Sequence, residues 1–98
     1  MIEIRKRDTT AESPEWRKTG EFFVGIGMND HIRLTVYRNT TDPDLHRLTS
    51  DEETKAGARL IAVFTEPPGG QEDWHPAWRT DSMRPTVERQ ARAIARRK

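Results

Sequence analysis

The 98-residue chain contains no cysteine, which excludes disulfide bonds and metal sites built on thiolates. It has no apolar run near the roughly 18–20 residues that a membrane-spanning helix needs. From Glu3 onward the N-terminus is charged, and it lacks the apolar stretch of a signal peptide. These absences predict a single soluble domain, residues 1–98, that resides in the cytoplasm and does not enter a membrane.

Apolar residues are also scarce, because hydrophobic residues make up 33% of the chain and charged residues 34%. A chain of this size and composition can bury only a small core. Its apolar residues nevertheless recur with regular periods, which is not typical of a disordered chain. A homodimer that shared apolar surface would enlarge the core, so a second copy is among the expected partners.

Motifs for catalysis or cofactor binding are missing as well. His31, His46 and His75 are scattered and have no metal-ligand spacing. Gly25-Ile26-Gly27 lacks the third glycine of a dinucleotide-binding fingerprint. His75 beside Asp73 could form a base with an orienting carboxylate, but no serine or cysteine nucleophile is recognisable by motif. We therefore expect no enzyme, no catalytic residues, no cofactor and no metal site.

What the chain does contain is a hairpin over residues 21–38. Apolar residues alternate in both halves, and Asn29-Asp30 between them tolerates the positive φ of a tight turn. The alternating residues are Phe22, Val24, Ile26, Met28, Ile32, Leu34 and Val36. Before the hairpin, residues 2–6 alternate as a short strand would, and residues 13–20 predict one or two helical turns anchored by Trp16.

Residues 51–65 fit two different elements. Ser50 with Glu53 three residues later matches a capping box, and the apolar residues up to Phe64 share one side of a helix. The run Leu60 to Phe64 alone is also compatible with a buried strand. The caps favour the helix. Pro67-Pro68 would end it.

The last segment predicts a second helix over about residues 83–97. Met83, Val87, Ala91 and Ile94 form its apolar stripe, with Arg89, Arg92 and Arg96 almost opposite. The fold class is therefore α+β. We expect a small antiparallel sheet built on the 21–38 hairpin, with two helices (about 51–65 and 83–97) packed on one face.

Charge is divided unevenly along the chain. Residues 82–98 hold six basic residues and one acid, whereas residues 39–81 hold nine acids and four bases. Arginine-rich helices bind nucleic acid because phosphate neutralisation releases counterions. We therefore predict a non-catalytic module that contacts nucleic acid through Arg84, Arg89, Arg92, Arg96, Arg97 and Lys98. Two other interpretations stay open: a plain solvated face, and a helix that docks on an acidic surface, either the chain's own middle segment or a partner.

The alternative hypothesis is a small protein-interaction or inhibitor module, of the kind encoded by mobile elements. It would present the acidic face of residues 42–53 and 66–73 to a larger protein. Its contact residues would be Glu72, Asp73, Trp74 and Trp78, because exposed tryptophan is enriched in binding hot spots. In a chain with so few large apolar residues, both tryptophans can instead fold back to close the core.

Overall fold

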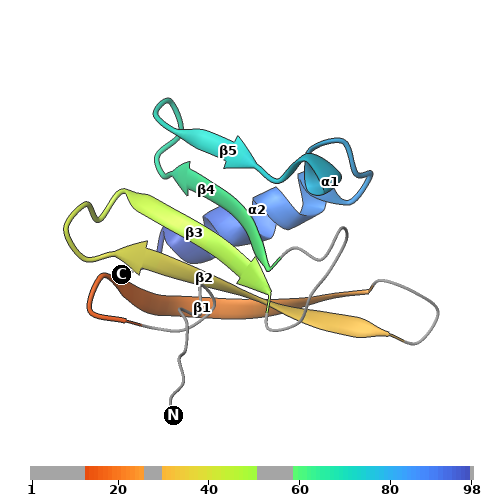
Figure 1. The fold of residues 1–98 in the computed structure, drawn as a ribbon, viewed down its shortest axis with the longest axis horizontal. Coiled ribbons are helices and arrows are strands. Elements are labelled where there is room, and N and C mark those ends of the chain that lie inside the picture. The colour runs from red at the N-terminus through yellow and green to blue at the C-terminus, as the bar shows by residue number, and fades with distance from the viewer. Residues whose placement is uncertain (1–12, 26–29, 51–58, 98) are drawn as a thin grey trace, which may run out of the picture.

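The computed structural model of the protein describes residues 13–25, 30–50 and 59–97. Five antiparallel strands form one sheet in which each strand pairs with the next along the chain (Figure 1). The strands are β1 (Trp16–Gly25), β2 (His31–Asn39), β3 (Leu45–Ser50), β4 (Leu60–Thr65) and β5 (Glu72–Trp74). Two helices follow, α1 (Pro76–Arg79) and α2 (Arg84–Ala95). The α+β class is confirmed.

The predicted hairpin forms the first half of this sheet. Phe22 lies opposite Leu34 and Val24 lies opposite Ile32, so the alternating apolar residues of β1 and β2 share one face. Asp30, the second residue of the predicted turn, is exposed. Residues 26–29 of the hairpin lie outside the described residues, and so does the candidate strand of residues 2–6.

The helical turns expected over residues 13–20 are not present, because residues 16–20 belong to β1. Ser13 and Trp16 exchange backbone hydrogen bonds of 3.0 and 3.1 Å around Pro14-Glu15, which makes a tight turn in front of the strand. The backbone N–H of Thr40 also donates to Glu15 O at 2.9 Å. A helix of one or two turns is marginal by itself, and pairing with β2 satisfies more backbone groups.

The helix expected over about residues 51–65 is wrong where the structure can test it, since Leu60–Thr65 is strand β4. The first part of that helix, residues 51–58, lies outside the described residues. β4 lies between β3 and β5, so it is paired on both edges. Ile61 is the extra residue of a bulge, which leaves Ile61, Ala62 and Phe64 all buried. Non-local pairing therefore outweighs the helical period of the sequence.

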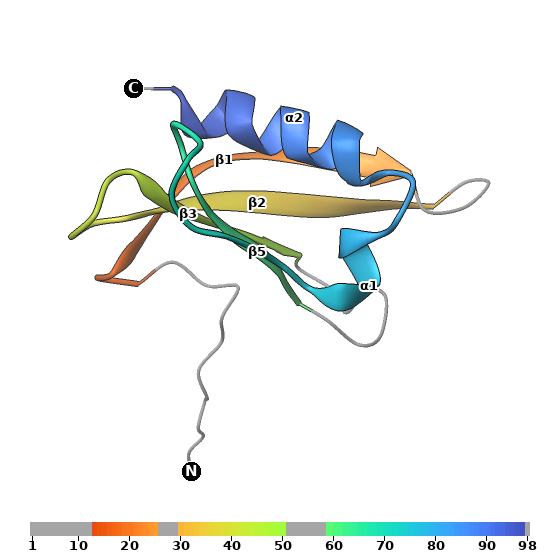
Figure 2. The same cartoon turned by 90° about the horizontal axis from the view of Figure 1, so that it is seen from above.

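The C-terminal helix is confirmed as α2, with ends one or two residues inside the expected limits. It lies across one face of the sheet, as Figure 2 shows. Between the helix and the sheet lie Phe22, Val24, Ile32, Leu34, Val36, Leu48, Phe64, Val87, Ala91 and Ile94. The contact is close at Gly20, where an added Cβ would lie 2.9 Å from Ile94 Cγ2. Glycine at this position lets α2 approach β1.

Neither helix of the described chain is long and apolar enough to span a bilayer.

Candidate nucleic-acid interface

Three of the six basic residues proposed for nucleic-acid contact form ion pairs within the protein, and two of them, Arg84 and Arg92, have more than one carboxylate partner. Arg84 Nη2 lies 2.7 Å from Glu72 Oε2 and 3.3 Å from Glu88 Oε1. Arg92 contacts Glu66 at 2.8 Å, Glu88 at 2.9 Å and Glu72 at 3.4 Å. Glu66 and Glu72 belong to the acidic middle segment, so α2 docks on the chain's own acidic residues. The interpretation of the helix as one that docks on its own middle segment is confirmed for these two arginines.

Arg92 is a buried structural residue. Only 11% of its side chain is exposed, and its guanidinium also donates to Thr65 O at 2.8 Å and lies 4.9 Å from the centre of the Phe64 ring. Burial opposes its charge, but hydrogen bonds to Glu88 and Glu66 outweigh that effect and raise its pKa. The expected outer ridge of Arg89, Arg92 and Arg96 is thus interrupted in its middle, because non-local carboxylates draw Arg92 toward the sheet.

The partner carboxylate, Glu66, is equally enclosed, with 6% of its side chain exposed. Burial by itself would raise its pKa, but hydrogen bonds from Arg92 and Arg96 outweigh burial and lower it. Glu66 is therefore ionised at neutral pH. Loss of Arg92 would leave this buried charge with only the largely exposed Arg96 as a partner.

The other basic residues of the helix point outward. Arg96 donates one hydrogen bond to Glu66 Oε2 at 3.0 Å, but 58% of its side chain is exposed. Arg89 and Arg97 are exposed, and within residues 13–25, 30–50 and 59–97 no carboxylate forms an ion pair with either. Lys98 lies outside the described residues.

Strand residues add further arginines where α2 ends. Arg38 Nη2 donates to Ala95 O at 3.0 Å and to Arg97 O at 2.6 Å, and so caps the helix carbonyls. Arg17 is exposed and lies directly opposite Arg38 in the β1–β2 register, which places both on the face covered by α2. We name this cluster of Arg17, Arg38, Arg96 and Arg97 the basic end. Arg17 and Arg38 could not be predicted from the sequence, because only the strand register brings them to the helix.

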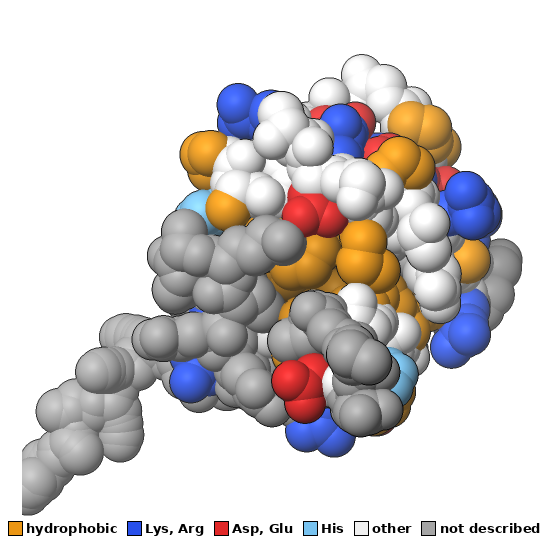
Figure 3. All heavy atoms as spheres, turned by 90° about the vertical axis from the view of Figure 1, so that its right-hand side faces the viewer, with side chains coloured by type: hydrophobic (Ala, Val, Ile, Leu, Met, Phe, Trp, Pro, Cys, Tyr) orange, Lys and Arg blue, Asp and Glu red, His pale blue; other side chains and the backbone are white. Residues whose placement is uncertain are grey.

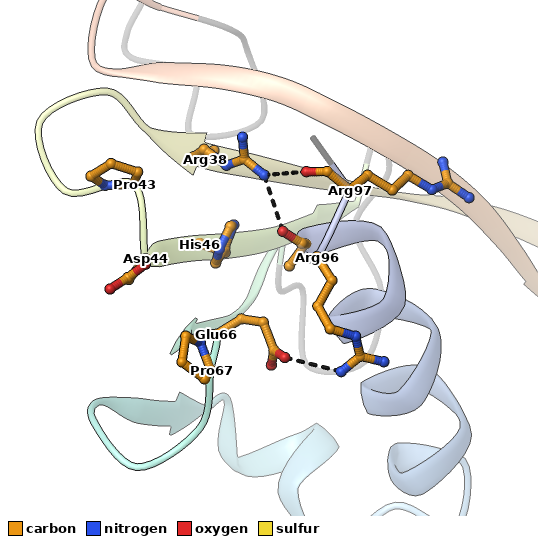
Figure 4. Close-up of a pocket in the computed structure, with 9 residues that line it drawn as sticks. Arg38, Pro43, Asp44, His46, Glu66, Pro67, Arg96 and Arg97 are labelled. Carbon is orange, nitrogen blue, oxygen red and sulfur yellow. Dashed lines mark hydrogen bonds and ion pairs between the residues drawn. The ribbon is translucent and has the colours of Figure 1, made fainter.

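An open recess of about 350 Å³ lies beside the basic end (Figure 4). In the close-up Arg96 reaches toward Glu66, whereas the guanidinium of Arg97 points away from the recess. Asp44 lies at the same recess and is exposed. Because these acids line it, the recess is not a purely cationic pocket. The basic groups that are available to bind an anion lie around the recess.

His46 also lines this recess and is 1% exposed. Burial, followed by the charge of Arg38, lowers the pKa of its imidazole, so the ring is neutral at neutral pH. It stacks on Phe64 with ring centres 5.6 Å apart. His46 therefore acts as a packing residue beneath the end of α2. Among the described residues no group of three or more histidines, aspartates or glutamates could hold a metal ion.

The opposite end of the molecule differs in charge pattern. Figure 3 shows the side to the right in Figure 1, away from the end of α2. Lys and Arg side chains lie there at separate positions, with acidic side chains among them. On this side the basic side chains that can be seen do not form one cluster.

Trp74 and Trp78 are not exposed anchors, because they are 5% and 1% exposed. Trp74 Nε1 donates to Glu72 Oε2 at 3.0 Å, and the guanidinium of Arg84 lies 4.9 Å from the centre of a Trp74 ring. Both indoles belong to the core, as the second interpretation of this segment expected. Of the four residues proposed for protein contact, Glu72 and Asp73 are exposed, and Glu72 is paired with Arg84.

His75 has a structural task that accounts for its position. Its Nδ1 accepts a hydrogen bond from the Ala77 N–H at 3.1 Å and so caps α1. Asp73 Oδ2 accepts from Gln71 Nε2 at 3.2 Å. These contacts explain both side chains without a catalytic pair.

Comparison of the chain with protein-family models, with curated proteins and with solved structures found no match.

Proposed function

We propose that the protein is a non-catalytic module that binds the phosphate backbone of nucleic acid through its basic end and Arg89. The observation that carries this proposal is the convergence of arginines from β1, β2 and the end of α2. Acids of the middle segment neutralise the arginines on the other side of the helix. Of the six basic residues predicted from the sequence, the proposal leaves out Arg84 and Arg92, because both are ion-paired with carboxylates of the protein.

The available arginines set the strength of the salt dependence. Arg17, Arg89 and Arg97 are exposed, and Arg96 keeps N–H groups beyond the one that Glu66 accepts. For duplex DNA, the slope of log K against log salt becomes more negative by about 0.9 for each phosphate that the protein neutralises. Four arginines therefore give a slope of roughly −3 to −4, whereas six free basic residues would give roughly −5.

The test is a titration of labelled duplex by fluorescence anisotropy across a salt series. Charge reversal at Arg17 and Arg97 together should abolish binding at moderate salt. Arg59→Glu is the matched control, because Arg59 is exposed just before β4, at the end of that strand away from the basic end. An affinity that does not change between low and high salt contradicts the proposal, as does an equal loss in Arg59→Glu.

The alternative, a protein-interaction or inhibitor module, has less support in the structure, because its two tryptophans are buried. Asp42, Asp44 and Asp73 remain exposed and could imitate phosphate. A pull-down with and without nuclease separates the two functions. A partner that survives nuclease and is lost in the Asp42→Lys, Asp44→Lys double variant favours the inhibitor.

A further inference from the structure

The face of the sheet opposite α2 carries an exposed aromatic side chain. Phe23 is 59% exposed, the highest value among the large apolar residues that the structure describes. Its neighbours Phe22 and Val24 are buried in the core under α2, and side chains alternate along a strand. Phe23 therefore points away from the helix, onto the other face of the sheet.

Cations accompany Phe23 on this face. Arg33, which is exposed, lies directly opposite Phe23 in the β1–β2 register. Lys18 is on the same side, with 48% of its side chain exposed, and its Nζ lies 2.7 Å from Glu21 Oε1. That contact, a hydrogen bond and ion pair in one, raises the pKa of Lys18. Lys18 is thus charged at neutral pH.

A second aromatic group lies farther along the same face. The guanidinium of Arg47 lies 4.7 Å from the centre of a Trp16 ring and 5.1 Å from the centre of the Tyr37 ring. Contacts of this length are favourable cation–π interactions, so Arg47 lies over both rings, and Tyr37 is only 5% exposed. On this face of β1 the residues follow in the order Trp16, Lys18, Glu21 and Phe23, so one acid, paired with Lys18, lies among the aromatic and basic side chains. We name Trp16, Lys18, Phe23, Arg33, Tyr37 and Arg47 the aromatic face.

We propose that the aromatic face binds single-stranded nucleic acid, with a base stacked on Phe23 and phosphates beside Arg33 and Lys18. Single strands expose the flat faces of their bases, and proteins that bind them combine aromatic platforms with positive charge. A duplex hides those base faces within its own stack, so it cannot use Phe23 in this way. The inference extends the proposed nucleic-acid binding to a second face of the sheet and does not depend on the basic end.

The test compares a labelled deoxythymidine strand of about 12 nucleotides with a duplex of the same length. Phe23→Ala should weaken single-strand binding about 5- to 150-fold, the range that the loss of one base–aromatic stack produces. It should leave duplex affinity unchanged, and Phe23→Trp should restore single-strand binding. Leu60→Ala is the matched control, since Leu60 is the other exposed large apolar residue described, at 38%.

The outcomes separate this inference from the proposed function. Single-strand affinity that depends on Phe23, together with duplex affinity that does not depend on Arg17 and Arg97, supports the aromatic face and rejects the basic end. Duplex binding through Arg17 and Arg97, together with single-strand affinity that Phe23→Ala leaves unchanged, does the reverse. Equal losses in Phe23→Ala and Leu60→Ala, or an effect of Phe23→Ala confined to self-association, overturn the inference. No binding of either nucleic acid rejects both proposals.

Discussion

The α2 helix carries two sets of arginines whose surroundings differ. Arg84 and Arg92 face β4 and β5, where Glu66 and Glu72 neutralise them. Arg96 and Arg97 lie at the end of the helix, beside Arg38 of the sheet. The two sets look alike in sequence and differ in how far carboxylates enclose them, because Arg96 keeps one contact with Glu66 but 58% of its side chain is exposed. Arginines that hold the fold together should therefore be separable by mutation from arginines that are available to a ligand.

The largest expected effect is a loss of stability when an arginine of the ion-paired set, Arg84 and Arg92, is replaced. Arg92→Ala removes the buried partner of Glu66 and leaves it only the exposed Arg96, and breaking a buried ion pair costs about 3–5 kcal/mol. Urea unfolding followed by tryptophan fluorescence measures the change. Arg89→Ala is the control, because an exposed substitution without such a contact stays within about 0.5 kcal/mol of wild type.

A second measurement identifies the cause of that loss. If the undercompensated Glu66 carboxylate is responsible, adding Glu66→Gln to Arg92→Ala should recover part of the lost stability, since the remaining group is neutral. A double variant that is less stable than Arg92→Ala would show instead that Glu66 contributes through Arg96 or through packing.

The next effect concerns the contact between α2 and β1. In Gly20→Val the new side chain would start 2.9 Å from Ile94 Cγ2 and 3.2 Å from Arg97 Nη1, so the Ile94 side chain or the helix that carries it must move. Overpacking of this kind costs about 1–3 kcal/mol. Thermal unfolding should show the loss for Gly20→Val. At Gly25 an added Cβ would meet its nearest atoms at an ordinary 3.9 Å, so Gly25→Ala should unfold like wild type.

Stability should also fall in mild acid because of His46. Its pKa is lowered from 6.5 by burial and then by Arg38; Glu66 and Asp44 act in the opposite direction, and Arg92 acts with Arg38. Below pH 6.5 the His46 imidazole binds a proton more readily in the unfolded chain than in the folded one. Acid therefore stabilises the unfolded state relative to the folded state. One proton changes the unfolding free energy by at most about 1.4 kcal/mol per pH unit.

Urea unfolding at about pH 7.5 and about pH 5.5 tests this effect on either side of the ordinary histidine pKa. His46→Leu should lose part of the pH dependence, whereas His31→Leu, at an exposed position, should keep it. Equal pH dependence in wild type and His46→Leu would assign the acid sensitivity to other groups.

The parts of the fold that could be predicted from sequence are those with local signals. The hairpin follows from alternation in adjacent segments, and α2 follows from its apolar stripe. Leu60–Thr65 could not be assigned, because its pairing with β3 and β5 is non-local and its own pattern also fits a helix. The same limit applies to the site. Arg92 pairs with Glu66, which lies 26 residues earlier in the sequence. Arg17 lies at the basic end only because the strand register places it opposite Arg38.

The smallest expected effect is the most direct test of the comparison between the two sets of arginines. Arg97→Ala removes one exposed cation and should reduce the slope of log K against log salt for duplex binding by about 1. Arg84→Ala removes the same charge from a site already paired with Glu72 and Glu88. It should leave the slope nearly unchanged, because the charge it removes already has carboxylate partners within the protein. Equal reductions in both variants would mean that carboxylate pairing does not keep Arg84 from the phosphates, and the basic end would lose its distinction from the rest of α2.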